Sequence, residues 1–145
     1  MIEQANQKPN AFFWIIGVLA LAWNAMGVYM YLMNVYLSEE AFAQMSEAEQ
    51  TLYENIPAWV TGAFAIAVFA GFLGSIGLLL KKKWAAPLFA LSLIALVIHQ
   101  GYNQLAAKLY TVSGTGTIFF SLMLILIAVA LYLYARSWSA KGWLK

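Results

Sequence analysis

Four long apolar runs, separated by short polar or charged segments, account for most of the chain. A hydrocarbon core of about 30 Å is crossed by about 20 helical residues, because each residue advances an α-helix by about 1.5 Å. The pattern therefore predicts an all-α fold, an antiparallel four-helix transmembrane bundle that forms a single transmembrane domain over residues 1–145. The predicted spans cover residues 11–37, 57–80, 84–105 and 117–134.

The second apolar run carries small residues at helical spacing. Apolar helices gain little from contact with one another in lipid, so close approach of their backbones over small side chains supplies much of the packing. We therefore expect this run to form the helix on which the others pack. Its small residues fall in two neighbouring rows, Ala63, Ala67, Gly71 and Ser75 in one, and Ala67, Ala70, Gly74 and Gly77 in the other.

The only strongly polar segment covers residues 38–56 and contains five glutamates. Ser38 and Ser46 are suitable N-cap residues, and Ser46 followed by Glu49 fits a capping box. The segment is therefore predicted to form one or two short helices, an acidic extracytoplasmic lid over the mouth of the bundle.

Charge is segregated between the connections. Lysine and arginine in short loops mark the cytoplasmic side of a membrane, which predicts that both termini are cytoplasmic. The Lys81–Lys83 run is chiefly a determinant of this topology, with binding of anionic headgroups as a secondary interpretation. The lead, the second connection and the tail carry Lys8, Lys81, Lys82, Lys83, Arg136, Lys141 and Lys145 against Glu3, whereas the other two connections carry Lys108 and five glutamates.

Composition agrees with this interpretation. The chain is 63% hydrophobic and 10% charged, whereas a soluble domain carries about 25% charged residues. The expected environment is thus the lipid bilayer. Cysteine is absent, which excludes disulfides and thiolate metal sites. No catalytic sequence pattern is present, so we predict no enzymatic activity, no cofactor and no nucleic-acid partner.

Polar residues inside the spans are the candidates for function. On the predicted topology they lie between mid-depth and the outer surface, where they could converge on an outward-opening cavity beneath the lid. Hydroxyl and amide groups beside aromatic rings suit a small neutral solute, such as a sugar, or a lipid headgroup. The alternative is that they only hydrogen-bond between helices. The predicted site residues are Asn24, Tyr31, Thr61, His99, Tyr102 and Asn103.

His99 is the single histidine, and it lies in the unusually polar far end of the third span, HQGYNQL. Ionisable groups inside a membrane are costly and often functional. The imidazole could be a satisfied structural group, part of a solute pocket, a proton-relay group, or a haem or metal ligand. A single histidine without any cysteine offers too few ligands to favour a metal site within one chain, although two chains could supply a histidine pair for haem.

Most of the chain, residues 12–135, resembles a family of small bacterial four-span membrane proteins commonly labelled as sugar transporters. The resemblance rests on the runs FWIIGVLALAWNAMGVYMYLMNVYL, LYENIPAW, AFAIAVFAGFLGSIGLLLKKKWAAPLF and HQGYNQL. It implies a bacterial inner-membrane location and transport of a solute, and it supplies no known binding residues. Size and helix number also resemble the DoxX-like group, without its signature.

Three classes of function follow. The first is transport or binding of a small neutral solute, for which a homo-oligomer is expected because four spans are few for alternating access. The second is a non-catalytic accessory or scaffold subunit of a larger inner-membrane complex. The third is a membrane redox protein in which His99 binds haem.

Overall fold

The computed structural model describes residues 8–145, and every regular element within that range is a helix. The first seven residues of the predicted polar lead lie outside the described part. Four helices within residues 8–145 are long and apolar enough to cross a membrane, which confirms, for this range, the prediction of an all-helical structure with four candidate spans. The long helices are α2 (Ala11–Val35), α5 (Ala58–Leu79), α6 (Ala85–Gly101), which the π-helical turn η1 (Tyr102–Ala106) extends, and α8 (Gly116–Ala140).

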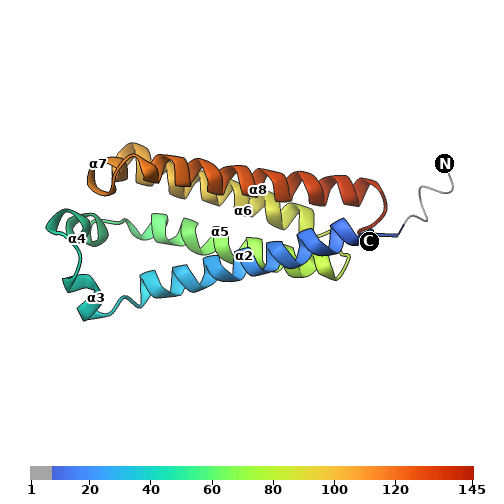
Figure 1. The fold of residues 1–145 in the computed structure, drawn as a ribbon, viewed down its shortest axis with the longest axis horizontal. Coiled ribbons are helices and arrows are strands. Elements are labelled where there is room, and N and C mark those ends of the chain that lie inside the picture. The colour runs from blue at the N-terminus through green and yellow to red at the C-terminus, as the bar shows by residue number, and fades with distance from the viewer. Residues whose placement is uncertain (1–7) are drawn as a thin grey trace.

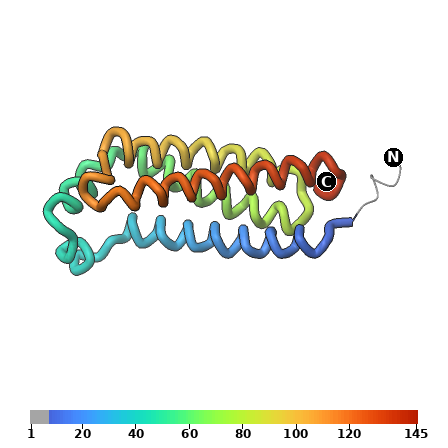
Figure 2. The backbone as a smooth tube through the Cα atoms, turned by 45° about the horizontal axis from the view of Figure 1, so that its top comes forward, coloured from blue at the N-terminus to red at the C-terminus, as the bar shows by residue number. Residues whose placement is uncertain are grey.

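The long helices lie side by side along the molecule (Figure 1). Contacts between the neighbouring helices α2 and α5 run in opposite order along the two helices: Gly17 of α2 lies near Leu79 of α5, and Gly27 of α2 lies near Val68 of α5. The short helices gather at one end, which we call the glutamate-rich end (Figure 2). They are α3 (Glu39–Ala43), α4 (Glu47–Glu54) and α7 (Leu109–Ser113).

Helix α5 is the packing centre, as the small-residue rows predict. It packs along both α2 and α6, and the residues of both rows are buried. A side-chain carbon added at Gly71 would collide with the amide oxygen of Asn24, and one added at Gly77 would collide with the Trp84 ring. The glycines therefore permit the close approach of the neighbouring helices, and the rows serve packing within the chain.

The acidic segment forms two short helices, and its predicted caps are confirmed. The Ser38 hydroxyl accepts from the backbone N–H of Ala41. Ser46 and Glu49 form the reciprocal capping box, in which each side chain accepts from the backbone N–H of the other residue. Because these caps satisfy N–H groups that a helix start leaves without partners, the two helices form although each is short.

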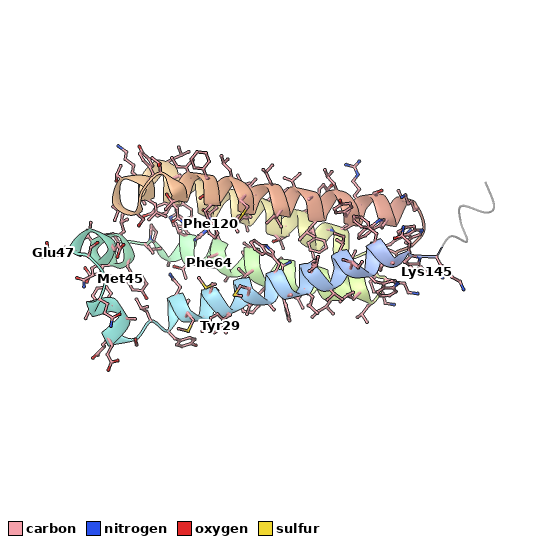
Figure 3. All side chains as sticks on the ribbon, in the orientation of Figure 1. Tyr29, Met45, Glu47, Phe64, Phe120 and Lys145 are labelled. Carbon is pink, nitrogen blue, oxygen red and sulfur yellow. The ribbon has the colours of Figure 1, made fainter. Side chains whose placement is uncertain are left out.

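The opposite end of the molecule, which we call the lysine-rich end, is closed by the last residues of the chain (Figure 3). Helix α8 continues to Ala140, past the span end expected at residue 134, and residues 143–144 fold back into a buried cluster instead of forming a basic tail. Gly142 has a φ of 81°, which permits the reversal. The buried cluster contains Phe13, Leu78, Ala85, Phe89, Ala135, Trp138, Trp143 and Leu144.

Aromatic rings explain this closure. Trp138 stacks on Tyr134 at 5.2 Å between ring centroids, and Trp143 stacks on Trp138 at 6.1 Å. Phe13 of α2 lies 4.7 Å from the Trp138 ring and 5.9 Å from the Trp143 ring. The backbone N–H of Lys145 donates to the carbonyl oxygen of Lys81 at 2.8 Å. The fold-back thus joins α8, α2 and the α5–α6 connection.

Candidate functional site

Asn24 lies apart from the other five predicted site residues. Its amide nitrogen donates to the carbonyl oxygen of Ala20 at 2.8 Å and to the hydroxyl of Ser75 on α5 at 3.1 Å. The Ser75 hydroxyl donates in turn to the carbonyl oxygen of Gly71 at 2.9 Å. Asn24 therefore links α2 to the centre of α5, which is the role that the alternative of hydrogen bonding between helices assigns to it.

Replacement Asn24→Ala is expected to lower the free energy of unfolding by about 0.5–1.5 kcal/mol, because interhelical hydrogen bonds in membranes are of modest strength. Ser75 retains its own acceptor, so no donor is left unsatisfied. Unfolding in mixed detergent micelles measures the change. Asn103→Ala removes an amide that has no side-chain partner in residues 8–145 and serves as the control, with unchanged stability expected.

Three aromatic side chains from three helices meet nearer the glutamate-rich end, and we call them the aromatic row. Phe64 of α5 lies 5.4 Å from the ring of Tyr31 on α2 and 4.6 Å from the imidazole of His99 on α6. Figure 3 labels Phe64 and shows Phe120 of α8 at the same level along the molecule. Two predicted site residues on different helices, Tyr31 and His99, are therefore brought together through Phe64, which is not one of the predicted site residues.

The next turn toward the glutamate-rich end adds a second aromatic pair. Tyr102 lies in the π-helical turn η1, and its ring meets that of Trp59 edge to face at 5.6 Å. Asn103 follows Tyr102 within the same turn. A π-helical turn widens the helix by one residue and is frequent at functional sites. It was not predicted from the sequence, and it changes which side chains share the face of His99.

Among the predicted site residues, five polar groups have no hydrogen-bond partner within the described part of the chain. Each belongs to a half-buried residue. An unpaired polar group in hydrocarbon costs several kcal/mol, so these groups require a partner that is polar itself. We call them the glutamate-end site: the hydroxyls of Tyr31, Thr61 and Tyr102, the Nε2 atom of His99 and the amide of Asn103.

A chain of hydrogen bonds lies behind His99, between α6, η1 and α8. The side-chain nitrogen of Gln104 donates to the carbonyl oxygen of Thr117 at 3.2 Å and to the hydroxyl of Ser121 at 3.0 Å. Ser121 donates to Oε1 of Gln100 at 2.6 Å, and Nε2 of Gln100 lies 3.3 Å from Nδ1 of His99. We call Gln104, Ser121 and Gln100 the amide chain.

The amide chain was missed as a candidate site. Gln100 and Gln104 were recognised only as part of a polar helix end, although their spacing of four places them on one helix face. Ser121 is a buried hydroxyl in a strongly apolar run, which is the signal that could have identified it. Its pairing with Gln100 depends on which face of α8 turns toward α6, and the sequence pattern does not determine that face.

Two cavities in the structure are lined by other residues. One, of about 310 Å³, lies at the glutamate-rich end beside α3 and α4. The other, of about 330 Å³, is an apolar groove between α2 and α8, where Ile16 and Trp23 face Ile127 and Tyr134. Within residues 8–145 no group of three histidine, cysteine, aspartate or glutamate side chains is placed to hold a metal ion.

Comparisons of the chain with protein families, with curated proteins and with solved structures find no match. The resemblance to small four-span bacterial proteins therefore stays a prediction.

Proposed function

We propose that the chain binds a small neutral solute at the glutamate-end site and takes part in its transport across a bacterial inner membrane. The observation that carries the proposal is a contrast within the spans. Asn24 and the donor groups of the amide chain are paired inside the protein, and Oε1 of Gln104 is buried there without a partner. The five groups of the glutamate-end site are unpaired, half-buried and border the aromatic row. Polar groups that already have partners hold helices together, and those without partners are available to a ligand.

The chemistry of the site favours an uncharged, hydroxyl-bearing solute such as a sugar. Helices α2, α5 and α6 and the turn η1 contain no Asp, Glu, Lys or Arg. Hydroxyl, amide and imidazole groups donate and accept hydrogen bonds without fixed charge, and the rings of Tyr31, Phe64 and Trp59 offer apolar surfaces to the faces of a sugar.

The proposed arrangement is an antiparallel four-helix transmembrane bundle with both ends of the chain in the cytoplasm. The opposed contact order of neighbouring helices supports it, as does the charge distribution. Lys81, Lys82, Lys83 and Lys141 lie at the lysine-rich end, whereas the glutamates of α3 and α4 lie at the other, in agreement with the positive-inside rule. The glutamate-end site then faces the extracytoplasmic half of the membrane, and transport by so small a chain involves a homo-oligomer.

The test is solute binding to the purified protein in lipid nanodiscs, measured by calorimetry with a panel of neutral sugars and polyols. We expect His99→Phe and Asn103→Ala each to weaken binding about tenfold, which is the loss of about one hydrogen bond to the solute. Asn24→Ala is the matched control: it lowers stability and leaves the affinity unchanged. Absence of binding across the panel, or an Asn103→Ala protein that binds like the wild type, would contradict the proposal.

The exposure of the flanking helices favours a second candidate, an accessory subunit of a larger membrane complex. Only 17% of the apolar stretch of α2 and of α8 is buried, against 44% for α5. Purification from native membranes in mild detergent, followed by mass spectrometry and an absorption spectrum, separates the candidates. A stoichiometric partner protein supports the subunit role, and a Soret band abolished by His99→Ala supports haem binding by a histidine pair.

A further inference from the structure

We infer that the amide chain fixes the tautomer of His99, so that the glutamate-end site presents an N–H donor at Nε2 and receives a hydrogen-bond acceptor of the solute. The choice of acceptor rests on the proposed function, whereas the tautomer does not depend on any solute. The inference goes beyond a general affinity for neutral molecules, because it states which end of a hydrogen bond the solute must supply at this position.

The direction of the amide chain is set at the carbonyl oxygen of Thr117. A carbonyl oxygen only accepts, so the group of Gln104 that lies 3.2 Å from it is the NH₂ group and not the amide oxygen. The same nitrogen donates to the hydroxyl of Ser121. The orientation of the Gln104 amide is thereby determined by a backbone group that cannot change its role.

Each later link follows from the one before it. The Ser121 hydroxyl accepts from Gln104 and lies 2.6 Å from Gln100. This distance is usual for an O–H···O bond and short for an N–H···O bond, so the Ser121 proton is donated to Oε1 of Gln100. Because the oxygen of Gln100 is engaged by Ser121, its NH₂ group is the end that faces His99, at 3.3 Å from Nδ1. A reversed chain would place two oxygens together at Thr117, which no proton could bridge.

The imidazole therefore accepts at Nδ1. A neutral imidazole that accepts at one nitrogen carries its proton on the other, which is Nε2. The contact of the ring with Phe64, at 4.6 Å, limits its rotation. Gln100, Ser121 and Gln104 are thus positioning residues: they do not belong to the glutamate-end site, and they determine what His99 offers there.

This arrangement selects among solutes. The Nε2–H group binds a hydroxyl, ether or carbonyl oxygen of a neutral molecule, and it has no lone pair for a donor-only group such as an ammonium. An analogue in which the oxygen on His99 is replaced by hydrogen leaves the donor without a partner beneath the bound solute, and such losses produce strong discrimination.

The tautomer is directly measurable, because the chain contains one histidine. Protein labelled with ¹⁵N-histidine and reconstituted in lipid gives two imidazole nitrogen signals, and each shows whether its nitrogen carries a proton. We expect a protonated Nε2 and an unprotonated Nδ1 in the wild type. Gln100→Leu removes the donor to Nδ1, and we expect a mixture of the two tautomers. A wild-type protein with its proton on Nδ1, or an unchanged spectrum in Gln100→Leu, would overturn the inference.

Two serine variants separate positioning from loss of packing. Ser121→Ala breaks the amide chain at its centre, and it replaces Gln100→Leu if that protein does not fold; we expect it also to mix the tautomers. Ser92→Ala removes a different buried hydroxyl, which lies on α6. The Ser92 hydroxyl donates to the carbonyl oxygen of Ala67 at 2.6 Å and has no part in the amide chain. The control should keep the wild-type tautomer, and mixed tautomers there would contradict a specific role for the chain.

Sugars and polyols from the binding panel provide the solute readout. A bound solute should move the Nε2 signal more than the Nδ1 signal, and Gln100→Leu should weaken its binding about tenfold. A shift confined to Nδ1 would refute the acceptor requirement. If the tautomer is as expected and no solute binds, the positioning by the amide chain stands and the proposed function fails. If a solute binds to protein with the opposite tautomer, the proposed function stands and the positioning by the amide chain fails.

Discussion

Leu144→Ala is expected to lower the free energy of unfolding by about 2–5 kcal/mol, which is the usual cost of truncating a fully buried leucine. Leu144 has 0% of its surface exposed and lies in the cluster formed with Phe13, Trp138 and Trp143. Its truncation leaves a void that the stacked tryptophans cannot fill without giving up their contact with one another. Unfolding monitored by circular dichroism during titration with a denaturing detergent measures the loss.

The control for Leu144→Ala is Leu80→Ala, at the same end of the molecule. Leu80 is 58% exposed, so its truncation removes few protein contacts and should change stability by less than about 0.5 kcal/mol. Equal losses in the two variants would show that the fold-back of residues 143–144 contributes nothing specific to stability.

Gly71→Ala is expected to destabilise the protein by about 1–3 kcal/mol, because a methyl group at this position overpacks the centre of the bundle. The added carbon would collide with the amide oxygen of Asn24 and would lie 3.1 Å from the hydroxyl of Ser92. One substitution therefore presses on α2 and on α6 at the same time. Thermal unfolding in detergent should show a lower midpoint.

Gly62→Ala is the matched control for Gly71→Ala. Both glycines belong to α5, but a carbon added at Gly62 meets no atom within 4 Å. The change should leave stability unaltered or raise it by up to about 1 kcal/mol, because alanine has the higher helix propensity. Destabilisation of similar size in both variants would mean that backbone flexibility, and not close packing at Gly71, determines the effect.

The features that could be predicted from the sequence are those set by local rules. The length of the apolar runs determines the four helices, and the small-residue rows identify α5 as the packing centre. The capping box depends only on Ser46 and on Glu49 three residues later. The fold-back at the lysine-rich end could not be predicted in this way, since Arg136 and Lys141 give the tail a polar pattern that conceals the burial of Trp143.

The candidate site was predictable in part for the same reason. Polar residues in apolar runs are conspicuous, and Tyr31 and His99 do meet at Phe64. Which polar group pairs with which depends on the relative shift and rotation of whole helices. Asn24 was grouped with His99 although it bonds to Ser75, and the link of Ser121 with Gln100 joins residues 21 positions apart on different helices.

The closure of the lysine-rich end also has a consequence for the order of folding. Phe13 and Trp143 are separated by nearly the whole described sequence, so their contact has the highest entropic cost of loop closure among the aromatic contacts of residues 8–145. During synthesis α2 is complete long before α8 is made. Phe13, in the first turn of α2, therefore stays exposed until Trp138 and Trp143 have been synthesised. We expect the contact of Phe13 with the fold-back of residues 143–144 to form last. Its formation is then the step at which an insertion chaperone or a membrane protease would distinguish a fully folded chain from an incompletely folded one.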